Sequence, residues 1–202
     1  MITVNCTMAW LQHLPVLQGT KVRLEPLEQA HIPALVALGR DERIWSLMSV
    51  DGSKGNFLET HLKSAILKKA VGEQFPYTVY DRATGALIGS TMLYNLSPEH
   101  RKLEIGWTWY APEWWQTGHN RECKLLLLTL CFETLKTIRV QLTTDVNNFR
   151  SRKAIEGIGA VMEGILRNER IRANGAYRDS VIYSIIVQEW PEVKQKLEHA
   201  IR

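Results

Sequence analysis

A short polar segment that precedes a long apolar run is the clearest chemical feature of this sequence. Residues 114–130 read WWQTGHNRECKLLLLTL, which places Gly118 at the mouth of a strongly apolar helix. The first N–H groups of a helix are unpaired and form the positive end of its dipole, so they suit a phosphate group. Glycine also lets a ligand approach the backbone closely. The segment is therefore a candidate phosphate site, although a lone glycine before a helix is more often an ordinary turn.

Length and composition indicate one globular domain. The chain has 202 residues, 45% of them hydrophobic and 23% charged, without an internal repeat or a low-complexity linker. We expect a single domain over residues 19–202 after an N-terminal extension over residues 1–18. The net charge of +4 is spread along the chain, which argues against nucleic acid as a partner. The basic cluster between Arg150 and Arg178 is compatible with binding of an anionic small ligand.

Cysteine use and hydropathy favour a soluble, cytoplasmic protein. The three cysteines form no C-x-x-C pair, and Cys123 and Cys131 lie in the apolar run, where buried unreactive thiols are common. The opening residues lack a basic segment before a continuous apolar stretch, and no segment approaches the ~18 apolar residues of a membrane span. We therefore expect a reduced setting, no membrane contact and no metal.

The spacing of apolar residues predicts a mixed α+β order of elements. In the first half, strands are expected over residues 21–27, 76–80, 86–94 and 102–110, and helices over residues 31–38 and 57–71. The turn at residues 81–85 makes consecutive antiparallel strands the expected pairing. In the second half we expect helices over residues 122–135 and 151–158, and strands over residues 139–144, 161–166 and 180–187.

Four features in this order resemble the GNAT superfamily of acyl-coenzyme A-dependent N-acetyltransferases. They are a strand that ends in aromatic residues, the loop W-Q-T-G-H-N, a helix that begins R-E-C-K, and the motif N-x-x-S-R at Asn148 to Arg152. Within the superfamily the chain is similar to the branch that includes the ribosomal-protein alanine N-terminal acetyltransferases. The resemblance implies a GNAT-like fold with a central, mostly antiparallel sheet of six to seven strands, splayed at the acetyl-CoA site and flanked by about four helices.

The resemblance also implies acetyl-CoA as the co-substrate and suggests which residues contact it. Amides of the Gly118 loop would wrap the pyrophosphate, and the open edge of the strand over residues 104–110 would pair with the pantetheine arm. Glu122 matches an acidic position that favours the helix dipole. His119 is expected to be a structural or phosphate contact. The implied coenzyme-binding residues are Thr108, Trp109, Tyr110, Gln116, Thr117, Gly118, His119, Asn120, Arg121, Asn148 and Ser151.

Direct attack of an amine in a ternary complex is the mechanism that the resemblance implies. A backbone N–H of the open strand would then hold the oxyanion. Glu104 is the candidate base, directly or through water, and its alternative role is an exposed strand residue paired with a surface base. Ser151 is the candidate acid and equally suits a helix N-cap, while Tyr183 is a second candidate acid.

The acceptor is expected to be a primary amine, on a small molecule or at a protein or peptide N-terminus. The irregular stretches over residues 40–56 and 168–179 are where binding residues tend to concentrate. Trp45 could instead cap the core, and Trp107 could be an ordinary core residue of its strand. The candidate acceptor-binding residues are Trp45, Tyr94, Trp107 and Tyr177, the last together with Arg178 and Asp179. A monomer and a homodimer both remain open.

Two positions depart from the resembling family and favour an alternative function. Gln116 stands where the branch often has glycine, and Asn120 stands where glycine or alanine is usual. Asparagine tolerates unusual backbone angles, so the loop could persist. The alternative is a non-catalytic GNAT-like domain that binds an acyl-CoA or a partner. Polyamines and aminoglycosides also remain open as acceptors, and these would favour an acidic pocket that the sequence does not locate.

Overall fold

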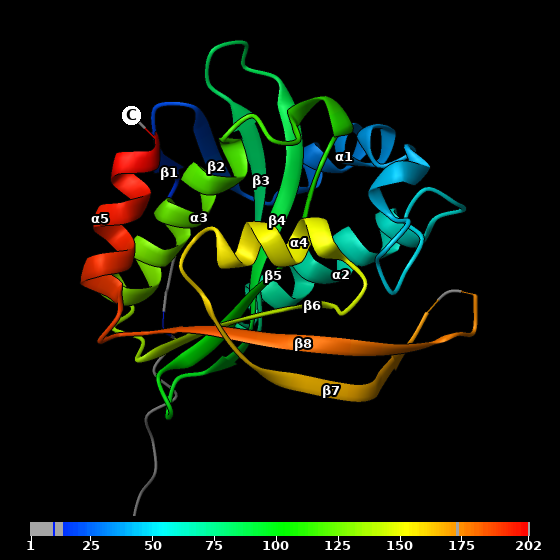
Figure 1. Ribbon diagram of the computed structural model, residues 1–202. Coiled ribbons are helices and arrows are strands. Elements are labelled where there is room, and N and C mark those ends of the chain that lie inside the picture. Colours follow the sequence, from blue (N-terminus) through cyan, green and yellow to red (C-terminus); the bar gives the residue numbers. More distant parts are fainter. Residues whose placement is uncertain (1–9, 11–13, 173, 202) are drawn as a thin grey trace, which may run out of the picture.

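An eight-stranded sheet organises the chain (Figure 1). The computed structural model describes residues 10, 14–172 and 174–201. Within these residues the strand order is β1-β2-β3-β4-β5-β6-β8-β7, and all neighbours are antiparallel except β5 and β6. The strands are β1 (Leu17–Gln18), β2 (Val22–Pro26), β3 (Phe75–Asp81), β4 (Leu87–Ser97), β5 (Lys102–Tyr110), β6 (Arg139–Asp145), β7 (Val161–Ile171) and β8 (Tyr177–Ile186).

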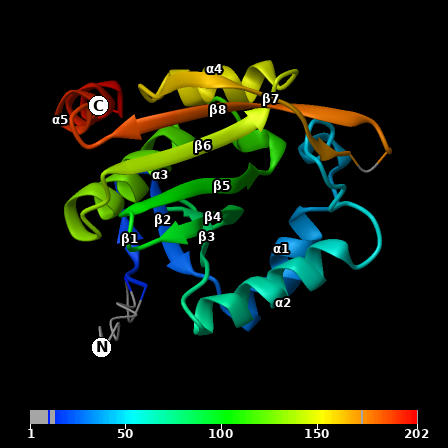
Figure 2. The ribbon, with the colours of Figure 1, turned by 90° about the horizontal axis from the view of Figure 1, so that it is seen from below.

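Helices cover both faces of this sheet, as Figure 2 shows for α1 and α2 on one side and α4 on the other. Two buried clusters follow this division, because α1 and α2 pack with Met92 and Trp109, while α3 and α5 pack with the apolar side chains of the larger cluster. The helices are α1 (Ile32–Leu38), α2 (Phe57–Ala70), α3 (His119–Thr129), α4 (Phe149–Glu156) and α5 (Trp190–Ile201). None of them, within the described residues, has the length and apolar character needed to cross a bilayer.

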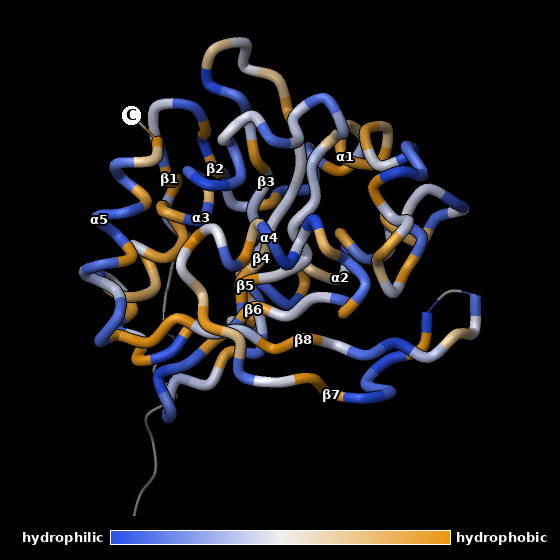
Figure 3. Tube along the Cα trace, viewed as in Figure 1, coloured by the Kyte–Doolittle hydropathy of each residue, from blue (hydrophilic) through white to orange (hydrophobic). Residues whose placement is uncertain are grey.

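The β7–β8 hairpin changes character along its length (Figure 3). Its half nearest α5 carries many hydrophobic residues, whereas the half that extends away from α5 is mostly hydrophilic. Val181, Tyr183 and Ile185 of β8 belong to the larger buried cluster. The near half therefore completes the core. The polar far half carries Arg170 and Arg178, which line the cavity described below.

The mixed α+β class and the mostly antiparallel sheet are confirmed, and the structure adds two elements to the expected set. The two-residue strand β1 precedes the expected domain start and pairs with β2. The C-terminal helix α5 was missed, although its buried residues Trp190, Val193 and Leu197 follow helical spacing. Helix α3 begins at His119 and not at residue 122, because Gly118 is its N-cap. The part of the extension over residues 1–9 and 11–13 lies outside the described residues.

The sheet is splayed between β5 and β6, as the resemblance implies. These parallel strands pair only at Lys102, Leu103 and Glu104, opposite residues 139–141. Beyond Glu104 they separate. On the other side of β5 a bulge interrupts the pairing with β4, and there Trp107 adopts a left-handed φ of 49°. A bulge of this kind bends its strand and re-aims side chains, so β5 is bent where the sheet opens.

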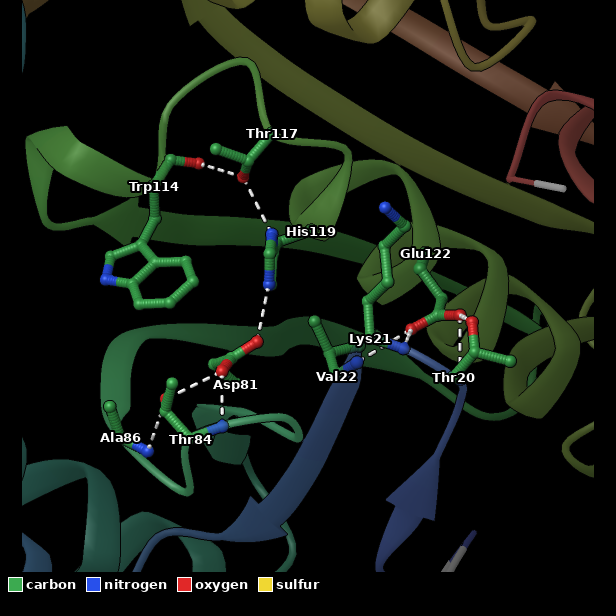
Figure 4. Close-up of polar contacts among 10 residues, drawn as sticks. All are labelled: Thr20, Lys21, Val22, Asp81, Thr84, Ala86, Trp114, Thr117, His119 and Glu122. Atoms are coloured by element: carbon green, nitrogen blue, oxygen red, sulfur yellow. Dashed lines mark hydrogen bonds and ion pairs between the residues drawn. The ribbon is translucent and has the colours of Figure 1, made fainter.

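A buried carboxylate joins the start of α3 to the first strands of the sheet (Figure 4). The Glu122 side chain is 3% exposed and accepts hydrogen bonds from the backbone N–H groups of Thr20, Lys21 and Val22 at 2.7–2.8 Å. The Thr20 hydroxyl donates to the same carboxylate at 2.5 Å. Burial raises the pKa of Glu122, but these hydrogen bonds outweigh it and hold the pKa below its ordinary value of 4.5. The first turn of α3 is therefore fixed to the turn between β1 and β2.

We expect Glu122→Gln to lower the free energy of unfolding by about 2–3 kcal/mol at pH 7, because an amide NH₂ would face backbone donors. The folded-state pKa is depressed, so the carboxylate stabilises the fold above pH ~4.5 and this contribution is lost as the pH falls through the folded pKa. The difference between wild type and variant should therefore shrink in acid.

Urea unfolding of both proteins at pH 7 and at stepwise lower pH measures this difference. Glu113→Gln, at an exposed carboxylate just before the same helix, is the matched control and should leave the unfolding free energy nearly unchanged. Equal stability of Glu122→Gln and wild type at pH 7 would show that the carboxylate is not the anchor described above.

Candidate functional site

A cavity of about 820 Å³ opens where β5 and β6 separate. Its walls are β5, the loop before α3, the first turns of α4, the segment after α1, and the β7–β8 hairpin. Among the described residues that line it, the basic side chains are Arg121, Lys124, Arg150, Lys153, Arg170 and Arg178, and none is Asp or Glu. The cavity is therefore electropositive and suits a ligand that carries negative charge.

The loop before α3 presents a helix N-terminus to this cavity. Gly118 caps the eleven-residue helix with a φ of 90°, and an added Cβ would meet only the Lys21 side chain, at 3.8 Å or more. Glycine is thus required for conformation and not for space. Gln116 also has a left-handed φ, of 62°, which explains why glycine would be favourable at that position. Gln116, Gly118, Asn120 and Arg121 all line the cavity.

The side chains of Thr117 and His119 brace this loop from behind (Figure 4). The His119 ring is 8% exposed and lies with Nε2 at 2.9 Å from Asp81 Oδ1 and Nδ1 at 2.7 Å from Thr117 Oγ1. Thr117 Oγ1 also donates to the carbonyl of Trp114. The hydroxyl of Thr84 and the His119 ring hold the pKa of Asp81 at about 2. The expected structural role of His119 fits this position, whereas its ring does not face the cavity as a phosphate contact would.

Helix α4 forms the opposite wall. Its N-cap is Asn148, whose Oδ1 accepts a hydrogen bond from Ser151 N at 3.0 Å, so the alternative of Ser151 as the N-cap is wrong. Ser151 instead lies in the first turn and lines the cavity. The Arg150 guanidinium stacks 3.6 Å from the ring centroid of Trp115, and burial lowers its pKa. Trp115 Nε1 donates to the carbonyl of Tyr110, so this stack connects α4 to the end of β5.

Glu104 is buried at the point where β5 and β6 separate, with 3% of its surface exposed. It accepts hydrogen bonds from Tyr94 OH at 2.5 Å, Asn95 Nδ2 at 3.0 Å and Gln141 Nε2 at 3.3 Å. The alternative of an exposed residue paired with a surface base is therefore wrong. Tyr94 lines the cavity whereas Glu104 does not. Burial and the neighbouring Glu104 raise the pKa of Tyr94, so its phenol remains protonated and connects the cavity to the carboxylate.

A buried lysine in the cavity wall was not expected from the sequence. Lys124 is 5% exposed, and its Nζ donates to Thr108 Oγ1 at 2.6 Å, with Thr91 Oγ1 at 3.5 Å. Burial lowers the pKa of this amine. The sequence signal was present, because Lys124 directly precedes the four consecutive leucines of this helix. Thr108, Trp109 and Tyr110, which the resemblance assigns to the coenzyme, also line the cavity.

The candidate acceptor residues separate into two groups. Tyr94 and Trp107 line the cavity, and the Trp107 ring stacks on His61 with ring centroids 3.8 Å apart. Trp45 is 3% exposed and its Nε1 donates to Gly39 O, so it is a core residue. Tyr177 is 71% exposed and does not line the cavity. The residues of the 40–56 stretch that do line it are Ile44, Met48 and Ser49.

The second candidate acid, Tyr183, is fully buried and outside the cavity wall. Its hydroxyl donates to Glu156 at 2.8 Å and accepts from Arg152 at 3.2 Å. Tyr183 therefore has a packing role, and of the two candidate acids only Ser151 lines the cavity. In the described part of the chain no three His, Cys, Asp or Glu side chains gather in a group that could hold a metal ion.

Residues 21–161 match the family described as acetyltransferase (GNAT) domain. Among curated proteins, the "Putative ribosomal N-acetyltransferase YdaF" of Bacillus subtilis is 38% identical over 106 residues, which are 52% of this chain and 57% of that protein. The chain thus spans little more than half the length of this relative.

Solved structures match over nearly the whole chain. A crystal structure of a "putative acetyltransferase" from T. thermophilus is 34% identical, with a TM-score of 0.83, and the match covers 95% of this chain and all of that one. The Mycobacterium smegmatis RimJ structure, in complex with CoA-disulfide, shares the fold at 20% identity, with a TM-score of 0.77 and coverage of 92% and 93%. With the family match extending over more than half of the sequence, the chain belongs to the GNAT family of acetyltransferases.

Proposed function

We propose that the protein is an acetyl-CoA-dependent N-acetyltransferase that transfers the acetyl group to a primary amine, such as a protein or peptide N-terminus. The observation that carries this proposal is the basic cavity at the splay, which has the N-terminus of α3 on one wall and the Tyr94–Glu104 pair near another. One region fits a phosphorylated donor, and the other holds groups that can accept a proton from an amine. Direct attack in a ternary complex requires both regions in one cavity.

The donor region fits coenzyme A by charge and by backbone geometry. The unpaired amides at Gly118 and Asn120 suit the pyrophosphate, and Arg121 and Arg150 add positive charge nearby. The edge of β5 that faces the splay supplies backbone groups for the pantetheine arm. A relative of the same fold, RimJ, is known in complex with a CoA disulfide. No metal is required for this chemistry.

The acceptor region fits base catalysis through two residues. The Tyr94 phenol faces the cavity and donates to Glu104, so it can take a proton from the attacking amine while it passes its own proton to the carboxylate. The amine nitrogen forms the C–N bond as the C–S bond of the thioester breaks. Ser151 lines the cavity and can give its hydroxyl proton to the departing thiolate. Solvent then returns a proton to Ser151 and takes the amine's proton from Glu104, so both groups are regenerated. Glu104 thus acts through Tyr94.

A non-catalytic coenzyme-binding domain is the alternative, and one observation favours it. Asn120 lines the cavity at a position where glycine or alanine is usual, and its buried Oδ1 has no hydrogen-bond partner among the described residues. The strained backbone of Gln116 lies in the same loop. A loop under such constraint could bind the coenzyme in a geometry that does not lead to transfer.

Calorimetry with coenzyme A, followed by thiol release from acetyl-CoA with a panel of amines and peptides, separates these functions. We expect saturable coenzyme binding and thiol release that depends on an acceptor. Binding without release on any acceptor would establish the non-catalytic alternative. Absence of coenzyme binding would exclude both functions.

Glu104→Gln is expected to lower kcat about 100-fold, because the amide can no longer accept the proton that Tyr94 passes on. Coenzyme affinity should change less than about twofold, since Glu104 lies outside the cavity wall. Steady-state rates and calorimetry measure the two quantities. The control Glu99→Gln, at an exposed carboxylate in the β4–β5 turn, should leave both unchanged. Wild-type rates in both Glu104→Gln and Ser151→Ala would reject these catalytic assignments.

Gly118→Ala is expected to weaken coenzyme binding about tenfold, because alanine disfavours a φ of 90° and the loop amides would turn from the phosphates. Gly85→Ala is a matched control in the β3–β4 turn, where φ is 72° and an added Cβ meets nothing within 4 Å. Both variants should lose about 1 kcal/mol of stability. Only the first should lose affinity, and equal affinity of the two variants would argue against the loop as the phosphate site.

A further inference from the structure

We propose that the acceptor carries a carboxylate close to its primary amine, and that Arg170 and Arg178 bind this carboxylate. The inference rests on the proposed function and names its substrate class. In the β7–β8 hairpin these two arginines stand directly opposite each other on neighbouring strands, and both line the cavity.

The arginine pair opposes two like charges across the ladder. Arg170 and Arg178 are Cα partners in the antiparallel pairing, a position where like charges destabilise a sheet. The Arg178 side chain is largely shielded from water, with the residue only 7% exposed. Burial lowers the pKa of Arg178, and the charge of Arg170 lowers it further. Such a pair is unfavourable unless negative charge lies close to it.

Protein carboxylates supply only part of that charge. Asp145 Oδ2 is 3.7 Å from Arg178 Nε but 2.6 Å from Arg172, which it pairs with more closely. Glu169 accepts from Arg170 Nε at 2.9 Å and also from the hydroxyl of Ser180. Among the described residues, Arg178 Nε has no hydrogen-bond partner. A buried guanidinium with an unpaired donor is costly, so a ligand carboxylate that reaches the cavity-facing part of the Arg178 side chain would be strongly favoured.

The pair lies at the acceptor end of the cavity. Tyr94, Arg170 and Arg178 line the same cavity, and the charges of the two arginines oppose the rise in the pKa of Tyr94 that burial and Glu104 cause. The segment that carries Met48 and Ser49 lies beside the tip of the β7–β8 hairpin in both views (Figures 1 and 2). A carboxylate on the arginines would therefore lie near the amine that Tyr94 deprotonates.

The same arrangement selects against polycationic acceptors. The described cavity wall has no acidic side chain, so polyamines and aminoglycosides would meet only positive charge. A carboxylate can instead accept paired hydrogen bonds from a guanidinium, which gives both affinity and orientation. An amino acid, or a peptide with an acidic residue next to its N-terminus, offers this chemistry.

The test compares acceptors that differ only in charge, at saturating acetyl-CoA. The peptides are Ser-Asp-Ala-amide, Ser-Asn-Ala-amide and Ser-Lys-Ala-amide, and free serine against serine amide distinguishes an α-carboxylate from a side-chain carboxylate. We expect kcat/KM for at least one carboxylate-bearing acceptor to exceed that for its neutral partner by at least tenfold, with the lysine peptide the poorest. Arg170→Gln should reduce this ratio toward one, and Arg170→Glu should favour the lysine peptide.

Two controls keep the outcomes distinct. Arg167→Gln, an exposed arginine of β7 outside the cavity wall, should preserve the wild-type ratio. Arg178→Lys retains the buried charge where a neutral residue could unfold the hairpin, and it should lower the ratio through loss of the paired hydrogen bonds. Coenzyme affinity is measured in every variant.

Robust turnover with equal kcat/KM for charged and neutral acceptors would overturn this inference and leave the proposed function intact. A wild-type ratio retained in Arg170→Gln and Arg178→Lys would overturn the assignment to these residues. Coenzyme binding without thiol release from any acceptor would overturn both the inference and the proposed function.

Discussion

The site depends first on the carboxylate of Glu122. A buried carboxylate is unfavourable by itself, and here it is stable because four donors from residues 20–22 surround it. The hydrogen bonds fix the first turn of α3 relative to the sheet, while the His119 ring fixes the preceding loop to Asp81. A helix N-terminus can bind an anion without reorganisation only if its amides are held in place. These two polar anchors provide that rigidity on the side of the loop away from the cavity.

The second constraint is the limited pairing between β5 and β6. Three residue pairs join these strands, and the sheet then opens. The opening would expose unpaired backbone if no ligand bound there, which is a cost that ordinary sheets avoid. Trp107 adds a left-handed backbone at the adjacent bulge, and such strain is found mainly where function maintains it. The cavity is thus a built feature of the sheet, and the β7–β8 hairpin, which continues the sheet beyond β6, contributes Arg170 and Arg178 to its wall.

Local patterns were sufficient to predict most of the fold and the helix-capping loop, because hydrophobic spacing and the Gly118 motif are properties of short segments. The surroundings of Glu104 could not be predicted, since its partners Tyr94 and Gln141 come from two other strands and depend on register. The opposition of Arg170 and Arg178 likewise depends on the register and bulges of the β7–β8 hairpin. Helix α5 was predictable from its spacing and was missed, whereas the burial of Trp45 required knowledge of the tertiary contacts.

For the proposed transfer to an amine, a basic cavity presents a problem, because the free acceptor would be a cation in water. Positive charge near the amine disfavours its protonated form and lowers its pKa, so the same field that opposes binding favours the neutral nucleophile. A carboxylate on the acceptor would offset the repulsion by pairing with Arg170 and Arg178, while the amine lies toward the phenol of Tyr94. The same two arginines would then attract the carboxylate of the substrate and disfavour the protonated form of its amine. In the proposed mechanism the buried Glu104 would then only need to accept, through Tyr94, a proton from an amine whose pKa the cavity has already lowered.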